Sequence, residues 1–424
     1  MKRILIHNAT IVNEGQSVKG SVVIEDGRIA EVLTNWKPLS APCDETIDAT
    51  GCYLLPGIID HVHFRDPGLT HKADILTESR AAAAGGVTSI MDMPNTNPVT
   101  TTLDALNAKL DLLNEKCIVN HSCYFGATND NYSEFGKLDK HRVCGIKLFM
   151  GSSTGNMLVD KMNSLLNIFN GTDMLIAAHC EDQETIKNNI AKYKEMFAGE
   201  NDIPIGKHPY IRSSAACYAS SELAVRLARI AGARLHILHV STAKELQLFN
   251  DYSLSEKHIT AEACVAHLLF TLSDYRTLGT RIKCNPAIKK QADRDALRAA
   301  VNSGLIDVIA TDHAPHLLSE KEGGALKAMS GMPMIQFSLV SMLQLVDEGV
   351  FTLETIVEKM CHAPAQIYRI NERGYIREGY RADLVLVRPD TPREVTADKV
   401  LSKCGWSPLE GHTFNWKVER TFAN

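Results

Sequence analysis

Two histidines separated by one residue follow an apolar run near the start of the chain. Residues 54–68 read LLPGIIDHVHFRDPG, so that His61 and His63 flank Val62. In a β-strand alternate side chains share a face, about 6–7 Å apart, which lets two imidazoles bind one cation. Two ordinary histidines at a strand end would look the same, and this motif alone leaves the two interpretations about even.

Other polar residues follow, or lie within, apolar segments further along the chain. They are Asn95, Lys147, His179, His239 and Asp312. If those segments are parallel strands of one barrel, the side chains at their carboxyl ends gather at one mouth. Each residue alone has an ordinary structural explanation. Four histidines and an aspartate at the same mouth predict a metal centre.

Lys147 is the least conventional member of this set, because strands of a parallel barrel are buried on both faces. A buried lysine is costly unless it is paired or neutral. It could extend its amine outwards between helices. The alternative is that Lys147, deprotonated beside cations, is carboxylated by carbon dioxide and bridges two metal ions.

The elements that must position these residues alternate between strands and helices, which is typical of a parallel sheet. Strands are expected at residues 57–62, 87–93, 118–124, 145–149, 174–178, 234–239, 259–263 and 306–311, with helical stretches such as 79–84 and 220–230. A further extended piece is expected at 281–284. Eight strand–helix units predict an α/β fold, a (β/α)8 TIM barrel. A doubly wound open sheet is the structural alternative.

Both ends of the chain have a different texture from the middle. Residues 1–52 alternate apolar and polar side chains around an Asp26-Gly27 turn signal, and residues 383–387 and 416–422 resume that pattern. Neither end has enough strands for a stable core of its own. We therefore expect one small composite β domain from residues 1–53 and 366–424, and a (β/α)8 barrel from residues 54–365.

Composition narrows the classes of partner. The chain has 424 residues, with 45 Lys and Arg against 50 Asp and Glu and a net charge of −5, well mixed along its length. The sequence shows no cluster of basic residues that would indicate nucleic-acid binding. No apolar run approaches the ~18 residues of a membrane span, and the first residues contain no apolar run as long as a signal peptide is expected to have. Eleven cysteines without a Cys-X-X-Cys pair indicate reduced thiols and a cytoplasmic protein.

Several of these segments together resemble a known family. Residues 56–63, PGIIDHVH, are similar to the opening metal motif of the cyclic amidohydrolases. The continuation FRDPG at 64–68, with MPNT at 93–96, DHAPH at 312–316 and GWSP at 405–408, resembles the dihydroorotase family. The resemblance covers nearly the whole chain. It implies a metallo-barrel whose composite end domain is a β-sandwich.

The resemblance also implies a ligand set around two divalent metal ions, zinc being the expected metal. His61, His63 and Asp312 would bind the first ion, His179 and His239 the second, and carboxylated Lys147 would bridge both. Arg65 and Asn95 match the pair that holds a substrate carboxylate. The remaining implied substrate contacts are His63, Asn285 and His316.

The implied reaction is hydrolysis of the ring amide of L-dihydroorotate, or closure of N-carbamoyl-L-aspartate in de novo pyrimidine biosynthesis. A hydroxide bridging the two metals is nucleophilic at neutral pH. Asp312 would take its proton and pass it to the departing ring nitrogen. The substrate is thus a small molecule. Family habit suggests a homodimer and association with aspartate carbamoyltransferase.

Some segments depart from the family pattern. His267 stands where relatives often have paired histidines, so a structural role is at least as plausible. Substrate contacts by Ser330 or Gly331 are weakly indicated. His236 and His313 have the opposite strand parity from His239 and Asp312, and we expect both to be structural.

Three alternatives remain open on the sequence alone. A hydantoinase, dihydropyrimidinase or allantoinase would use the same metals on uncharged rings, against which Arg65 and Asn95 argue. Residues 151–155, GSSTG, fit the serine-hydrolase elbow Gly-X-Ser-X-Gly, a short and permissive pattern. The same loop also follows the lysine strand, where relatives carry a flexible loop that covers the substrate. A non-catalytic partner subunit is the third alternative, although no expected metal ligand is missing.

Overall fold

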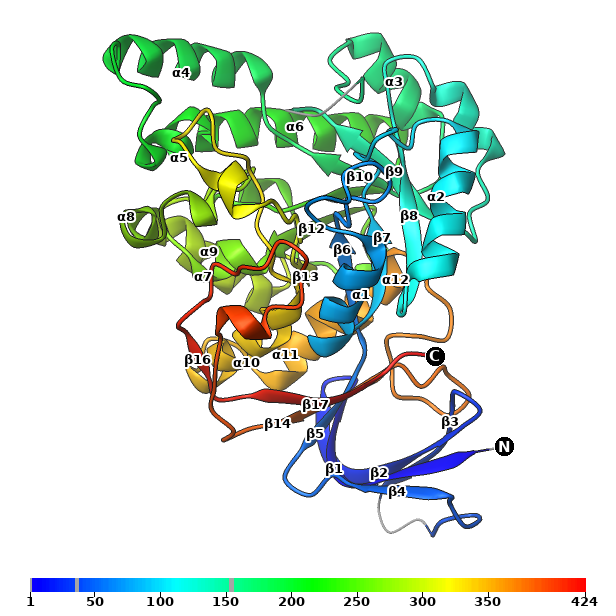
Figure 1. The fold of residues 1–424 in the computed structure, drawn as a ribbon. Helices are drawn as coiled ribbons and strands as arrows, with labels where there is room; N and C mark the ends of the chain where they lie inside the picture. The colour runs from blue at the N-terminus through cyan, green and yellow to red at the C-terminus, as the bar shows by residue number, and fades with distance from the viewer. Residues whose placement is uncertain (1, 35–37, 152–155) are drawn as a thin grey trace.

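A closed parallel barrel forms the body of the protein. The structure is a computed structural model that describes residues 2–34, 38–151 and 156–424. Within these ranges eight strands form a parallel sheet in the order β13-β12-β11-β10-β9-β8-β7-β6. A parallel bridge between Val62 and His313 joins its two edges. The predicted (β/α)8 barrel is therefore confirmed (Figure 1).

All eight expected barrel strands are present. They are β6 (Ile58–Val62), β7 (Val87–Asp92), β8 (Asn120–Gly126), β9 (Val143–Phe149), β10 (Ile176–His179), β11 (Leu235–Ile237), β12 (Ile259–Cys264) and β13 (Val308–Ala310). The extended piece expected at 281–284 was wrong, because a 3-10 helix, η6 (Gly279–Ile282), occupies its start. Its apolar residue, Ile282, is buried from a turn rather than from a strand.

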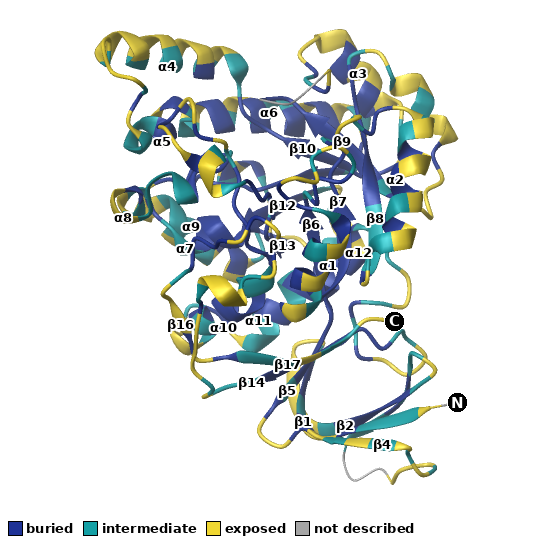
Figure 2. Ribbon diagram, in the orientation of Figure 1, coloured by how far each residue is buried: buried dark blue, intermediate teal, exposed yellow. Residues whose placement is uncertain are grey.

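The helices lie mainly around the outside of the barrel, with their exposed faces outwards (Figure 2). They are α1 (Ile75–Ala84), α2 (Leu103–Lys116), α3 (Met162–Asn170), α4 (Gln183–Met196), α5 (His208–Ile211), α6 (Ser214–Ala231), α7 (Val265–Leu269), α8 (Tyr275–Leu278), α9 (Gln291–Ser303), α10 (Ser338–Asp347), α11 (Leu353–Val357) and α12 (Ala363–Ile367).

Local signals explain where the helices begin and end. Asp74 caps α1 by accepting from Thr77 N, and the reciprocal contact from Thr77 completes a capping box. Ser213 caps α6, which ends at Gly232 in the left-handed conformation. The strands, by contrast, are buried on both faces. Every residue of β6 and β7 is buried, although their sequences, IIDHV and VTSIMD, mix apolar and polar residues.

Both chain ends build a second sheet at the base of the barrel (Figure 1). In the described ranges it has seven strands: β1 (Arg3–Asn13), β2 (Gln16–Glu25), β3 (Arg28–Thr34), β4 (Glu45–Asp48), β5 (Tyr53–Pro56), β14 (Leu384–Arg388) and β17 (Lys417–Phe422). Its path is β17-β14-β5-β1-β2-β3, with β4 beside β1, so strands from the two ends lie side by side. Asp26 and Gly27 both have positive φ, as a two-residue hairpin between β2 and β3 requires. The separate sheet expected from the two chain ends is confirmed.

The segment between β14 and β17 leaves this sheet and packs against the barrel. It contains the short pair β15 (Arg393–Glu394) and β16 (Thr413–Phe414). Trp406 joins the barrel core, and its Nε1 donates to the carbonyl of His316, 2.8 Å away. The tail thus supports a loop at the mouth of the barrel. Across the described ranges, no helix combines the length and apolar character that crossing a membrane would need.

Candidate metal centre and active site

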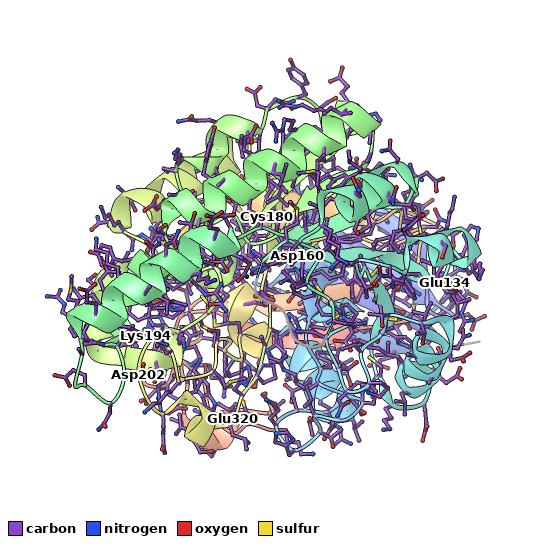
Figure 3. The ribbon with its side chains drawn as sticks, turned by 90° about the horizontal axis from the view of Figure 1, so that it is seen from above. Glu134, Asp160, Cys180, Lys194, Asp202 and Glu320 are labelled. Atoms are coloured by element: carbon purple, nitrogen blue, oxygen red, sulfur yellow. The ribbon has the colours of Figure 1, made fainter. Side chains whose placement is uncertain are left out.

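One cavity of about 510 Å³ opens where the carboxyl ends of the barrel strands meet. Nearly all of the predicted site residues line it: His63, Arg65, Asn95, Lys147, His179, His239, Asn285, Asp312 and His316. His61 lies behind this surface and is 1% exposed. Side chains that are up to 255 residues apart in the chain therefore converge at one mouth of the barrel. In the view from above, Cys180, which follows His179, lies near the middle and Glu320 lies nearer the edge (Figure 3).

His61, His63 and Asp312 form the first cluster. His61 Nε2 and His63 Nε2 lie 3.4 and 3.0 Å from the same oxygen, Asp312 Oδ1. Burial opposes protonation of His61, but Glu262 and Asp312 outweigh it and raise the His61 pKa to about 10. The two carboxylates therefore require a positive charge between them. A metal cation bound at Nε2 can supply it in place of the proton.

His179 and His239 form the second cluster. His179 Nδ1 lies 3.1 Å from His239 Nε2. The other nitrogen of His179, Nε2, is 3.0 Å from Glu181 Oε2 and donates to that carboxylate. His179 Nδ1 then carries a lone pair that faces the neighbouring ring. The opposite nitrogen of His239, Nδ1, has no hydrogen-bond partner among the described residues.

These separations fit ligands of a shared metal ion. Zinc–nitrogen bonds are about 2.0–2.1 Å long in tetrahedral sites, which puts neighbouring ligand atoms about 3.3 Å apart. The observed 3.0, 3.1 and 3.4 Å separations bracket that spacing. Within residues 2–34, 38–151 and 156–424, no three His, Cys, Asp or Glu side chains form a complete metal-holding group. The donors converge in the two clusters described above, and Lys147, which lines the same cavity, is the remaining candidate ligand.

Lys147 lies on β9 with its amine directed into the cavity. The side chain is 2% exposed, and its Nζ is 4.5 Å from the centre of the Phe149 ring. No hydrogen bond or ion pair of this amine occurs within the described ranges. Burial lowers the Lys147 pKa to about 8, although Asp312 and Glu262 oppose the shift. A substantial fraction of neutral amine at physiological pH is what reaction with carbon dioxide needs.

Arg65, Asn95 and His316 form a polar wall beside the first cluster. Asn95 Oδ1 accepts from His63 Nδ1 over 2.7 Å, so its amide group is free to donate into the cavity. Arg65 is 7% exposed, donates to the Pro315 carbonyl and places Nη2 3.1 Å from His316 Nε2. All three side chains can therefore present donors to one anion.

The backbone at three site residues is unusual. Arg65, His239 and Asp312 have φ of 66°, 42° and 50°, the left-handed region that non-glycine residues rarely adopt. Such conformations cost about 1–3 kcal/mol each and persist where the surrounding structure holds them. Here they turn side chains at the ends of strands towards the cavity.

Asn285 lies between two buried histidines, one of which, His267, stands where the sequence departs from the family pattern. Asn285 lines the cavity, and its buried Oδ1 has no partner among the described residues. His267 does not line the cavity; its Nε2 donates to the Pro286 carbonyl over 2.9 Å. His208 donates similarly to the Cys284 carbonyl over 2.9 Å. Two buried histidines thus fix the backbone on either side of Asn285.

The remaining sequence expectations differ in outcome. Ser330 and Gly331 line the cavity. His236 and His313 do not: His236 pairs with Thr260 over 2.8 Å, and His313 with Glu78 over 2.8 Å. Residues 152–155, which carry most of the possible serine-hydrolase elbow and covering loop, lie outside the described residues.

Sequence reasoning missed the acidic residues that hold the histidines. Glu262 on β12 is 1% exposed; its Oε2 lies 3.0 Å from His61 Nδ1, and its Oε1 accepts from His239 N over 3.2 Å. Glu181, which is fully buried, pairs with His179 and with Arg212. Carboxylates that fix the second nitrogen of metal-binding histidines are typical of metal sites. A charged residue inside the apolar run of β12 was the available signal.

Comparisons with known proteins show the family of the chain. The model of the Amidohydrolase family matches residues 53–423. A dihydroorotase of Halobacterium salinarum is 32% identical over 92% of this chain and 91% of its own length. An allantoinase of Bacillus velezensis is 28% identical over 99% and 92%. The solved structure of the L-hydantoinase (dihydropyrimidinase) of Arthrobacter aurescens has a TM-score of 0.92 and 27% identity, and the match covers 99% of this chain and 94% of that chain. The chain therefore belongs to the amidohydrolase family.

Proposed function

We propose that this cyclic amidohydrolase is a dihydroorotase, which hydrolyses the ring amide of L-dihydroorotate and closes N-carbamoyl-L-aspartate in the reverse direction. The observation that carries the proposal is the buried Arg65, which lines the same cavity as the candidate metal ligands. A guanidinium binds a carboxylate through two parallel hydrogen bonds, and L-dihydroorotate carries such a group.

The charge of the cavity supports an anionic substrate. Apart from Lys147, which is proposed to be carboxylated, its described lining includes the basic side chains Arg65, Lys72, Arg212 and Lys283 against a single acid, Asp312. Lys72 and Arg212 are neutralised by Glu320 and Glu181. Arg65 forms no ion pair with any described residue. An uncharged ring would leave the buried Arg65 cation without a counter-charge. An enzyme that binds uncharged rings would therefore pay the free-energy cost of an unpaired buried charge.

The residues that would hold two divalent metal ions, proposed to be zinc, are His61, His63 and Asp312 on one side and His179 and His239 on the other. Carboxylated Lys147 would bridge the two groups. When bound, the metals supply a water molecule that is nucleophilic at neutral pH and polarise the amide carbonyl. Glu262 and Glu181 hold the imidazoles so that the opposite ring nitrogens face the cavity.

Asp312 is the proposed proton carrier. Burial raises its pKa, but the neighbouring imidazoles of His61 and His63 outweigh burial and hold the pKa well below its usual value. The carboxylate is therefore ionised and able to accept the proton of the attacking water. It would then donate that proton to the ring nitrogen as the carbon–nitrogen bond breaks. Its side chain is 20% exposed, so it can reach the substrate.

Substrate specificity tests the proposal directly. The purified metal-loaded enzyme should turn over L-dihydroorotate with a kcat/KM at least about 10³-fold above that for dihydrouracil, because the carboxylate pairs with Arg65. Arg65→Gln should lower kcat/KM for dihydroorotate by about 10²-fold or more. The kcat/KM for dihydrouracil should change little. Arg281→Gln, whose partner Glu410 lies outside the cavity, is the matched control.

The rival function is that of a hydantoinase or allantoinase. The L-hydantoinase structure and the allantoinase sequence are similar to this chain along its whole length. Preferred turnover of dihydrouracil, hydantoin or allantoin, unaffected by Arg65→Gln, would establish that alternative and overturn ours. A homodimer in the cytoplasm, in association with aspartate carbamoyltransferase, is also proposed; light scattering of the protein alone and mixed with that enzyme checks both assemblies.

A further inference from the structure

His316 lies between two cationic donors, and nothing in the proposed reaction explains one of them. Lys72 Nζ is 3.2 Å from His316 Nδ1, and Arg65 Nη2 is 3.1 Å from His316 Nε2. Lys72, Arg65 and His316 are 5%, 7% and 4% exposed. Ammonium and guanidinium groups donate hydrogen bonds and cannot accept them.

The imidazole cannot satisfy both neighbours. Burial, together with the positive charges of Arg65, Lys72 and Lys321, keeps the His316 pKa far below its ordinary value, so the ring is neutral. A neutral imidazole has one N–H group and one acceptor nitrogen. One of the two contacts is therefore a hydrogen bond, and in the other an imidazole N–H faces a donor.

The groups around His316 indicate which contact is the bond. Glu320 Oε2 lies 3.4 Å from His316 Nδ1 but forms no hydrogen bond with it, whereas Lys72 Nζ does. Lys72 is held in place, since its Nζ also donates to Glu320 Oε1 over 2.8 Å. Arg65 is held through its Nε by the Pro315 carbonyl and keeps the ends of its guanidinium at the cavity. With Lys72 bonded to Nδ1, the His316 N–H is on Nε2. It then lies beside Arg65 Nη2, two donors 3.1 Å apart with no acceptor between them.

We propose that Lys72 is a positioning and specificity-determining residue that holds His316 in the Nε2–H tautomer and so makes His316 and Arg65 a paired donor site for the substrate carboxylate. The inference rests on the proposed function, because it assigns the carboxylate of the ring substrate to this pair. A carboxylate oxygen accepts from both groups and relieves the opposition between them. A neutral ring substituent at this position cannot do so.

A purely structural role for Lys72 is the competing explanation. Glu320 belongs to the 3-10 helix η7 (Leu318–Lys321) at the edge of the cavity, and its Oε2 also accepts from Leu317 N over 2.8 Å. The Lys72–Glu320 ion pair alone could serve to anchor this helix. In that case the loss of either partner would have the same effect on His316.

Nitrogen-15 NMR of histidine-labelled, metal-loaded enzyme separates the two roles, with His316 assigned by its absence in His316→Asn. Wild-type His316 should give the Nε2–H pattern. Lys72→Met should convert it to Nδ1–H, and Lys72→Arg should restore Nε2–H. Glu320→Gln should keep the wild-type pattern. If Lys72→Met folds poorly, Lys72→Met/Glu320→Gln removes both charges of the pair and should give Nδ1–H. An unchanged tautomer in the lysine variants, or the same conversion in Glu320→Gln, would overturn the proposal.

Kinetics provide the second readout. Lys72→Met should raise KM for L-dihydroorotate about tenfold or more, the effect of losing one charge-assisted hydrogen bond, and leave kcat within about threefold. Turnover of dihydrouracil should not change. The tautomer is measured without substrate. If the wild-type enzyme and the variants show the expected tautomers but the wild type does not turn over dihydroorotate, the result contradicts the proposed function and not the role of Lys72. If the wild type turns over dihydroorotate normally and Lys72→Met has an unchanged KM, the result contradicts the role of Lys72 and not the proposed function.

Discussion

Glu262 Oε2 and His61 Nδ1 lie 3.0 Å apart in the interior of the barrel, between strands β12 and β6. The glutamate is 1% exposed, and its contacts with His61 and His236 hold its pKa well below the ordinary value despite burial. This contact leaves Nε2 of His61 as the nitrogen that faces Asp312. Glu262 therefore determines which atom of His61 is available to a metal ion.

Removal of this carboxylate charge should weaken the metal centre. Glu262→Gln keeps the volume of the side chain but no longer stabilises a positive charge on His61. We expect metal affinity and activity to fall about 10- to 100-fold, the usual effect of losing such a partner. Competition with a chelator followed by metal analysis measures the change. Glu245→Gln is the control, since Glu245 is equally buried but bonds Ser221 and Thr242. Equal metal retention in the two variants would contradict the assignment.

Arg212 should act through Glu181 on the second histidine pair. The two side chains form an ion pair, and Glu181 is fully buried. Arg212→Met leaves that carboxylate without its cation, which should cost about 3–5 kcal/mol in the free energy of unfolding. Arg212→Met/Glu181→Gln should recover much of this stability yet still bind metal weakly at His179.

Urea unfolding and metal titration of the single and double variants test this chain of contacts. Arg229→Met provides a control, because Arg229 donates to the Leu248 carbonyl outside the cavity. A double variant with wild-type metal affinity would show that Glu181 does not orient His179.

Much of the fold, and the residues that line the cavity, could be predicted because both leave local patterns in the sequence. The eight strands are short apolar runs, and parallel strands bring their carboxyl ends together, so His61 and His179 could be assigned to one mouth of the barrel. The partners of those histidines could not. Glu262 and Glu181 meet them only through the register of neighbouring strands and the conformation of a loop, which spacing along the chain does not encode.

The contacts around Asn285 could not be predicted from the sequence for the same reason. His208 and His267 donate hydrogen bonds to the carbonyls of Cys284 and Pro286, which lie 76 and 19 residues further along the chain. The sequence shows His267 only as an isolated histidine after a strand. It also gave the misleading apolar pattern at 281–284, where a turn near Gly279 replaces the expected extended piece. Long-range contacts to carbonyl groups have no sequence signature.

His267 should make stability depend on pH. Burial lowers its pKa to about 4, against 6.5 for an ordinary histidine, although its bond to the Pro286 carbonyl opposes the shift. Between these values the unfolded chain binds a proton that the folded protein does not, so stability falls as pH falls from 6.5 to 4. At pH 5 the loss relative to pH 8 should be about 2 kcal/mol from this residue.

The measurement is urea unfolding at pH 8 and pH 5 for wild type and His267→Gln. The variant should lose less stability on acidification by about that amount, whatever the other histidines contribute to both proteins. His71→Gln, at a side chain that is 56% exposed, should behave like wild type. Parallel pH profiles for wild type and His267→Gln would show that His267 is not held neutral.

The account rests on a metal pair joined by Lys147, and its most direct test is metal analysis of the native protein together with the rate of L-dihydroorotate hydrolysis, repeated for Lys147→Ala. We predict about two equivalents of divalent metal in the native protein, and in the variant a loss of metal together with at least about 10²-fold lower activity. A Lys147→Ala enzyme with unchanged metal content and unchanged rate would contradict the account.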